Sequence, residues 1–190
     1  MLSLQGRTVG PELTAYFEES EARIRAMARV HEQLQLSDTV ASFDLAGYLA
    51  RLCEDFATIH GPAAPRILFR AASPQVPIAL DAATPIVLIL NEVLSNAVKH
   101  AFPQSRAGEV RIGLRCSRTR LVLQVRDNGI GLPSNRVEHV NSSMGLRLVD
   151  TLARQIGANV SFKLKAGTIF TLSIPRSAIE AEQVGLSMSR

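Results

Sequence analysis

The sequence contains few cysteines and no apolar run long enough to span a membrane. Its two cysteines, Cys53 and Cys116, lie far apart, so neither a disulfide framework nor a cysteine-based metal site is expected, and a reducing compartment fits best. The longest apolar runs, such as residues 85–90, are far shorter than the ~20 residues that a membrane span needs. The N-terminus also lacks the regions of a signal peptide. We therefore expect a cytoplasmic protein without membrane contact.

The sequence also has no strong excess of charge of either sign. It has 21 lysines and arginines against 17 acidic residues, a net charge of +4. The arginines are scattered along the chain, so we expect no nucleic-acid partner. Because 46% of the 190 residues are hydrophobic, the chain can bury a core without disulfides.

The N-terminal third predicts two amphipathic helices. After Pro11, seam positions from Leu13 to Leu34, apolar except for Ser20 and His31, alternate in steps of four and three, the period of a helix packed in a bundle or coiled coil. One such helix cannot bury its stripe alone, so residues 1–9 should hold the tail of a preceding helix and a hairpin loop. A second helix is predicted from about Asp44 to just before Gly61.

The rest of the chain predicts a mixture of strands and helices. One helix is expected to begin at Thr84 and Pro85, with Thr84 as its cap and Pro85 in its first turn. A further helix is expected over residues 144–156, and a short helix or loose tail over 175–190. This order indicates an α+β protein, a two-layer α/β sandwich. The predicted strands are 66–70, 76–80, 109–116, 120–126, 159–164 and 168–174.

A polar stripe runs along the helix predicted after Pro85. Glu92, Asn96 and Lys99 are spaced i, i+4, i+7, so they share one face, with His100 beside them. A carboxylate, an amide oxygen and an ammonium group can polarise a nucleophile, hold a hard cation and offset phosphate charge. The alternative is a solvent-facing stripe of an ordinary amphipathic helix.

A glycine-rich segment, residues 127–131, follows directly on an alternating strand. The Asp127 carboxylate can accept a hydrogen bond from an exocyclic amine, and Gly129 and Gly131 let the backbone approach a flat ring. The alternative is a hairpin turn. Residues 132–140 do not resume a strand, however, and are more typical of a lid.

Two further segments add weaker signals. Ser142 and Ser143 precede a helix that begins near Met144 and Gly145, and such a helix start can bind an anion. Gly167 and Thr168 lie between two strands and are ordinary when taken alone. The four segments in this order indicate an ATP site.

The set resembles the Bergerat-fold ATPases shared by gyrase, MutL-type repair proteins, heat-shock chaperones and sensor histidine kinases. Residues 91–102, Asn-Glu-Val-Leu-Ser-Asn-Ala-Val-Lys-His-Ala-Phe, are similar to the histidine kinases, and residues 26–34 and 144–149 resemble their compact-lid branch. The resemblance covers roughly residues 2–175. It implies a partial dimerisation hairpin over 1–41, an ATP-binding catalytic domain over 42–176, and a C-terminal tail over 177–190.

The resemblance also implies roles for individual residues and two cofactors, ATP and Mg²⁺. Asn96 would bind Mg²⁺, Glu92 would help to activate the phosphate acceptor, and Lys99 would lie near the phosphates. Two departures from the family pattern affect the phosphate region: Gly145 stands where many relatives have a pair of glycines, and Ala166-Gly167 replaces Gly-Gly. The remaining expected nucleotide contacts are His100, Asp127, which would read adenine, Gly129, Gly131, Gly145, Leu146, and Thr168, which would support Asp127.

The phosphorylated histidine of similar kinases lies in a His-Arg-Val-Lys-Asn-like segment, on the helix before the hairpin. The family-like residues 2–5 already resemble the end of that helix, so the chain looks like a fragment or a member that has lost autophosphorylation. His31 lies on the apolar seam and is expected to be a core or interface histidine. We therefore expect the ATP-binding catalytic region of a bacterial sensor histidine kinase, whose acceptor histidine is absent from this chain.

The expected partners are a response regulator and a second copy of the chain, although truncation of the hairpin would weaken the dimer. One alternative is a non-catalytic phosphorelay or scaffold module that docks a response regulator. Another is a protein-serine kinase or anti-sigma relative with the same ATP fold, which would not need the seam from Leu13 to Leu34.

Overall fold

The computed structural model describes residues 42–60, 66–71, 75–103, 106–131 and 144–180, together with Ile24 and Ala28. The helix predicted after Pro11 therefore lies outside the described residues except at Ile24 and Ala28, which are helical and exposed. The predicted lid and the end of the predicted tail also lie outside them.

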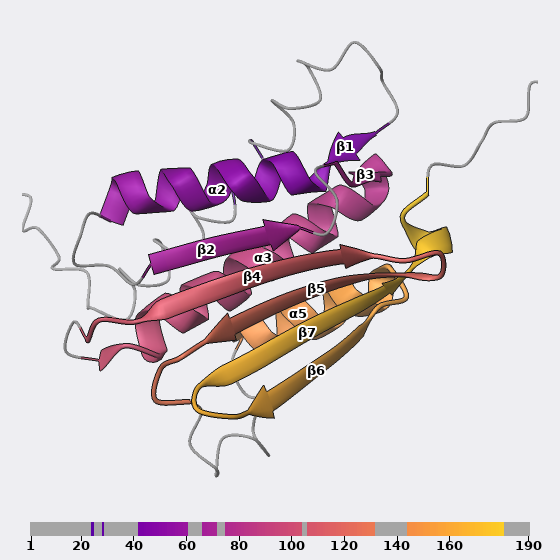
Figure 1. Ribbon diagram of the computed structural model, residues 1–190. Coiled ribbons are helices and arrows are strands. Elements are labelled where there is room, and N and C mark those ends of the chain that lie inside the picture. Colours follow the sequence, from indigo (N-terminus) through magenta and orange to yellow (C-terminus); the bar gives the residue numbers. More distant parts are fainter. Residues whose placement is uncertain are drawn as a thin grey trace, which may run out of the picture.

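The described part is a two-layer α/β sandwich, as predicted (Figure 1). A five-stranded sheet has the order β2-β4-β5-β7-β6, and a two-stranded ribbon pairs β1 with β3. Strand β2 runs parallel to β4, and the other neighbours are antiparallel. The helices are α2 (Leu45–His60), α3 (Leu80–His100) and α5 (Met144–Gln155), and the strands are β1 (Phe43–Asp44), β2 (Arg66–Ala71), β3 (Pro77–Ile78), β4 (Glu109–Cys116), β5 (Arg120–Asp127), β6 (Asn159–Leu164) and β7 (Thr168–Pro175).

One face of the sheet carries the core. In β4 and β5 alternate residues are buried, because successive side chains of a strand point to opposite faces. Ile112 and Leu123 belong to one cluster with Ile86 and Ile89 of α3, and α3 and α5 lie behind the sheet in Figure 1. Each fully buried side chain of this kind stabilises the fold by about 1.5–3 kcal/mol.

The start predicted for α3 is wrong by more than one turn. The helix begins at Leu80, so Pro85 lies inside it, and the strand predicted over 76–80 shrinks to Pro77–Ile78. Ala83 is fully buried, and the Ala79 N–H donates to the carbonyl of Ile179 at 2.6 Å. Burial and this long-range bond favour an extra helical turn, and they outweigh the hydrogen bond that proline cannot donate.

Strand β1 is absent from the predicted strands, and the remaining elements agree closely with the sequence analysis. Strands β4 and β6 match their predicted bounds, β2, β5 and β7 each extend one residue further, and α5 ends one residue earlier. A 3-10 turn over Arg176–Ala178 follows β7. None of the helices in the described ranges has the length and apolarity needed to cross a membrane.

Candidate functional site

Asp127 is the last residue of β5 and its carboxylate is held by backbone groups. The residue is 5% exposed. Its Oδ1 accepts the N–H of Gly129 at 2.9 Å and the N–H of Thr168 at 3.2 Å. Within the described ranges no hydrogen bond reaches Oδ2. The two backbone N–H groups that donate to Oδ1 fix the orientation of the carboxylate, as is normal for a buried polar group.

The loop after Asp127 packs against the end of α3. A Cβ at Gly129 would collide with the carbonyl oxygen and the Cβ of Ala101, and the Ile130 N–H donates to that same carbonyl at 3.0 Å. Any larger residue at position 129 would therefore push the loop away from the helix. Glycine here gives close contact between the loop and α3.

The turn between β6 and β7 closes on Asp127 from the other side. Gly167 has φ +117°, and a Cβ there would collide with the Asp127 carbonyl and come within 2.9 Å of Oδ1. Gly131, at φ +73°, lies beside it, since a Cβ at 131 would be 3.5 Å from the Gly167 carbonyl oxygen. Glycine is therefore required at position 167 by both conformation and space.

Ala166, directly before Gly167, is the non-glycine residue with positive φ in the described chain, at +47°. A left-handed conformation costs a residue with a Cβ roughly 1–2 kcal/mol. Ala166 therefore adds a local strain to the turn that places Gly167 against Asp127.

The polar stripe of α3 passes from buried to exposed along the helix. Glu92 is 4% exposed, which makes it one of two buried charged residues in the described chain. Asn96 is half-buried, and Lys99 and His100 are exposed. A uniformly solvent-facing stripe therefore does not describe this helix.

The stripe leads to the same place as Asp127. Asn96 lies five residues before Ala101, which is about 7.5 Å along a helix. Since Ala101 contacts the loop that begins at Asp127, the C-terminal part of α3 and the end of β5 meet at one edge of the sandwich.

The first turn of α5 supplies the remaining predicted residues. Gly145 is buried and Leu146 half-buried, and α5 packs against α3. The contacts described above join Asp127, Gly129, Gly131 and Thr168 to one another and to Ala101 at the end of α3, whereas Gly145 and Leu146 belong to the first turn of α5. Ser142 and Ser143 lie outside the described residues.

Sequence reasoning missed two residues that hold this geometry. Ala101 contacts the loop that follows Asp127. The signal for this contact in the sequence was its small side chain directly after His100. Asn128 joins the loop to β4: its N–H donates to the Glu109 carbonyl at 3.2 Å, and its Oδ1 accepts the Glu109 N–H at 2.8 Å. This side-chain bond joins two segments that are 19 residues apart in the sequence.

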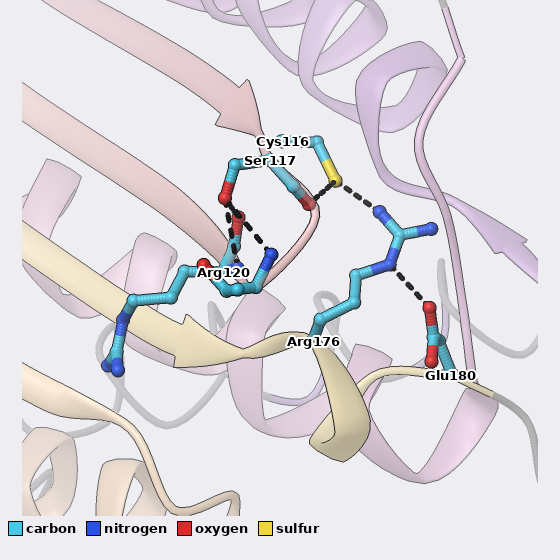
Figure 2. A network of polar contacts seen from close by, with 6 residues as sticks. Cys116, Ser117, Arg120, Arg176 and Glu180 are labelled. Carbon is cyan, nitrogen blue, oxygen red and sulfur yellow. Dashed lines mark hydrogen bonds and ion pairs between the residues drawn. The ribbon is translucent and has the colours of Figure 1, made fainter.

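A second polar network lies at the opposite end of the β4–β5 hairpin (Figure 2). The Arg176 guanidinium contacts Cys116 Sγ and the Glu180 carboxylate. The hydrogen bond with Glu180 is the main reason why the pKa of Arg176 is raised, with a smaller contribution from Cys116. Val110 pairs with Asp127 and Cys116 with Leu121, so about 20 Å of strand separates this network from the Asp127 site.

The described residues contain no group of three or more histidine, cysteine, aspartate or glutamate side chains able to hold a metal ion. A cation bound at the end of α3 would therefore have few protein ligands. Water or a bound molecule would supply its other oxygen ligands.

Two family models match the chain. Residues 81–178, about half of it, match the histidine kinase-, DNA gyrase B- and HSP90-like ATPases. Residues 1–60 match a histidine kinase family. Together the two matches cover both the sandwich and the segment before it.

Curated relatives are sensor histidine kinases. The blue-light-activated histidine kinase 2 of Erythrobacter litoralis is 27% identical over 183 residues, which cover 93% of this chain and 52% of that protein. Sensor histidine kinase PdtaS of Mycobacterium tuberculosis is 28% identical over 184 residues, 88% of this chain and 36% of that protein. The chain thus spans about half the length of these relatives or less.

A solved structure supports the same family as the curated relatives. The histidine kinase domain of the Erythrobacter litoralis EL346 blue-light-activated kinase superposes with a TM-score of 0.73 at 26% identity, covering 84% of this chain and 75% of that one. The predicted fold and the predicted histidine kinase family are therefore confirmed. The chain belongs to the histidine kinase-, DNA gyrase B- and HSP90-like ATPases, and it combines their ATP-binding region with a histidine kinase segment, as sensor histidine kinases do.

Proposed function

We propose that this chain binds Mg-ATP at the edge where α3, the end of β5 and the β6–β7 turn meet. We further propose that it acts as the catalytic region that transfers the γ-phosphoryl group to a histidine other than the four in its sequence. The observation that carries the proposal is the Asp127 carboxylate, whose Oδ1 is occupied by two backbone N–H groups. Its Oδ2 is left to accept a hydrogen bond from the adenine amine.

The adenine pocket would be built mainly from backbone. Gly129 and Gly131 let the loop lie close to a flat ring, and Thr168 supports Asp127 through its backbone N–H at 3.2 Å. His100, Gly145 and Leu146 are assigned to the rim of the nucleotide site.

The polar stripe of α3 would serve the phosphates. Bound ATP supplies the phosphoryl group, and the protein's part is to position groups and screen charge. We assign the Asn96 amide oxygen to Mg²⁺, with phosphate and water oxygens completing its shell. Lys99, exposed at the helix end, would offset phosphate charge, and the buried Glu92 carboxylate would accept a proton from the acceptor.

For the whole protein, we propose a cytoplasmic kinase that forms a homodimer through the segment before residue 42 and passes its phosphoryl group to a response regulator. The match of residues 1–60 to a histidine kinase family supports this assignment. A scaffold module that binds no nucleotide would share the fold, but it would not need the Asp127 carboxylate to be held in one orientation through Oδ1.

The proposal is tested by isothermal titration of Mg-ATP into the wild type and Asp127→Asn. Asparagine keeps an oxygen for Gly129 and Thr168 but cannot offer the second acceptor, so affinity should fall at least about tenfold, as expected for loss of one hydrogen bond to a charged group. Asp150→Asn, which removes an exposed ion pair with Arg154, is the matched control and should bind normally. Equal affinity of wild type and Asp127→Asn would contradict the adenine assignment.

The acceptor assignment is tested separately with γ-labelled ATP. We expect no acid-labile, base-stable phosphate on this chain, because none of its histidines stands in the family's acceptor segment. Labelling of the chain that disappears when His31 is replaced would overturn this part while leaving nucleotide binding untouched.

A further inference from the structure

The outward face of the sheet gathers arginines that the sequence scatters. In β4 and β5 the residues that alternate with the buried ones point away from the helices, and they include Arg111, Arg115, Arg120 and Arg126. Lys163 of β6 lies on the same face of the sheet. We call these five residues the basic sheet face. Helices α3 and α5 lie on the other side of the sheet (Figure 1).

The charge on this face is nearly all of one sign. Among the described outward side chains of β4 to β7, Glu109 is the single carboxylate, and it contacts Arg111. The Arg111 side chain is nevertheless 68% exposed. A surface shaped only for solubility normally mixes both signs, so this asymmetry needs another reason.

Two of the arginines stand directly opposite each other. Arg111 of β4 pairs in register with Arg126 of β5. Like charges in directly opposed positions of an antiparallel pair destabilise a sheet. A fold that keeps this arrangement retains an unfavourable pair, which an acidic partner would convert into a favourable cluster.

Some of the face is already ordered. The Arg120 Nε donates to the Ser173 hydroxyl at 2.6 Å and its Nη2 to the Ser173 carbonyl at 2.9 Å. Figure 2 shows this guanidinium pointing away from that of Arg176. Gln124 donates to the Thr171 hydroxyl at 3.3 Å on the same face. Side chains fixed before binding lose less entropy when a partner docks.

The dimensions suit a small contact. Arg111 and Arg115 are four residues apart, about 13 Å along a strand, and β4 and β6 are separated by three strand spacings, about 14 Å. A patch of this size fits the small, transient class of protein interfaces.

We propose that the basic sheet face docks an acidic protein surface. Guanidinium groups pair with carboxylates in a fixed, bidentate geometry. Single-stranded nucleic acid is the poorer fit because base stacking needs aromatic side chains, and the aromatic residues of β6 and β7, Phe162 and Phe170, pack against each other within the core layer. A membrane surface is also a poorer fit, because the large exposed apolar side chains of the described chain lie outside the outward positions of these strands.

The test measures the binding of a short poly-L-glutamate probe by fluorescence anisotropy at low and high salt. Arg111→Gln/Arg115→Gln/Arg126→Gln removes three charges from the face. Arg51→Gln/Arg118→Gln/Arg154→Gln removes three exposed charges elsewhere and is the matched control. An oligothymidylate of equal charge and phosphatidylglycerol-containing vesicles are measured in parallel.

We expect the face variant to bind poly-L-glutamate about tenfold more weakly and the control to stay within about twofold, since each exposed ion pair contributes little and three act together. Amide shifts in the wild type on titration should fall on β4, β5 and β6. The proposal is overturned if both variants lose affinity equally, if the shifts fall elsewhere, or if the oligothymidylate or the vesicles bind more tightly than poly-L-glutamate. None of the residues changed belongs to the proposed nucleotide site, so Mg-ATP affinity serves as a folding control.

Discussion

Gly167 lies so close to Asp127 that a side chain at position 167 would overlap both the backbone carbonyl and the carboxylate of that residue. Two segments forty residues apart in the sequence thus share one small volume at the proposed adenine site. The turn between β6 and β7 therefore controls the carboxylate as directly as its own strand does.

We predict that Gly167→Ala destabilises the protein and abolishes Mg-ATP binding. The change combines a strained φ of +117° with a collision, and together these should cost at least about 2 kcal/mol. Chemical denaturation and calorimetry measure the two effects. The neighbouring Ala166→Gly serves as control, because relief of its φ of +47° should leave stability unchanged or raise it by up to about 1 kcal/mol. Wild-type nucleotide affinity in Gly167→Ala would refute the role given to this turn.

We predict that Gly129→Ala weakens Mg-ATP binding by moving the Asp127 loop away from α3. The added methyl group would meet Ala101, so the distance between Asp127 and the polar stripe would change. Nucleotide titration of the folded variant measures the loss, which should be at least about tenfold because positioning errors of an ångström are costly. In Gly113→Ala the new methyl group meets nothing nearer than the Gln124 carbonyl at 4.0 Å, so affinity should be normal. A normal affinity in both variants would argue against close packing at Gly129.

We predict that the two cysteines differ in reactivity toward a thiol reagent. Burial, with a smaller contribution from Glu54, raises the pKa of Cys53 to about 11, so the reactive thiolate is scarce until the pH approaches that value. Cys116 is only half-buried and should be labelled first in the folded protein. Mass spectrometry of labelled peptides at pH values below and above the Cys53 pKa checks this order, and rapid labelling of Cys53 near neutral pH in folded protein would contradict it.

Local patterns predicted much of the fold. The alternation in residues 109–116 and 120–126 placed β4 and β5 to within one residue, because a strand with one buried face imposes a period of two on its own sequence. The start predicted for α3 at Thr84 and Pro85 was wrong because these two residue types are typical of a helix start. The true start at Leu80 depends on Ile179, almost a hundred residues away, which no local pattern reports. The domain boundaries at 41 and 176 stay predictions.

The sequence predicted the chemical groups of the candidate site, and the packing of the folded chain brought them together. The sequence alone determined which groups are available: a carboxylate at a strand end, an acid, amide and amine along one helix, and glycines near both, because these follow from residue type and spacing. Tertiary structure alone decided that Asp127 has one occupied oxygen, that Ala101 receives Gly129, and that Arg111 faces Arg126. Those relationships depend on strand register and on contacts between distant segments, which are set by the energy of the whole folded chain and not by any short stretch of it.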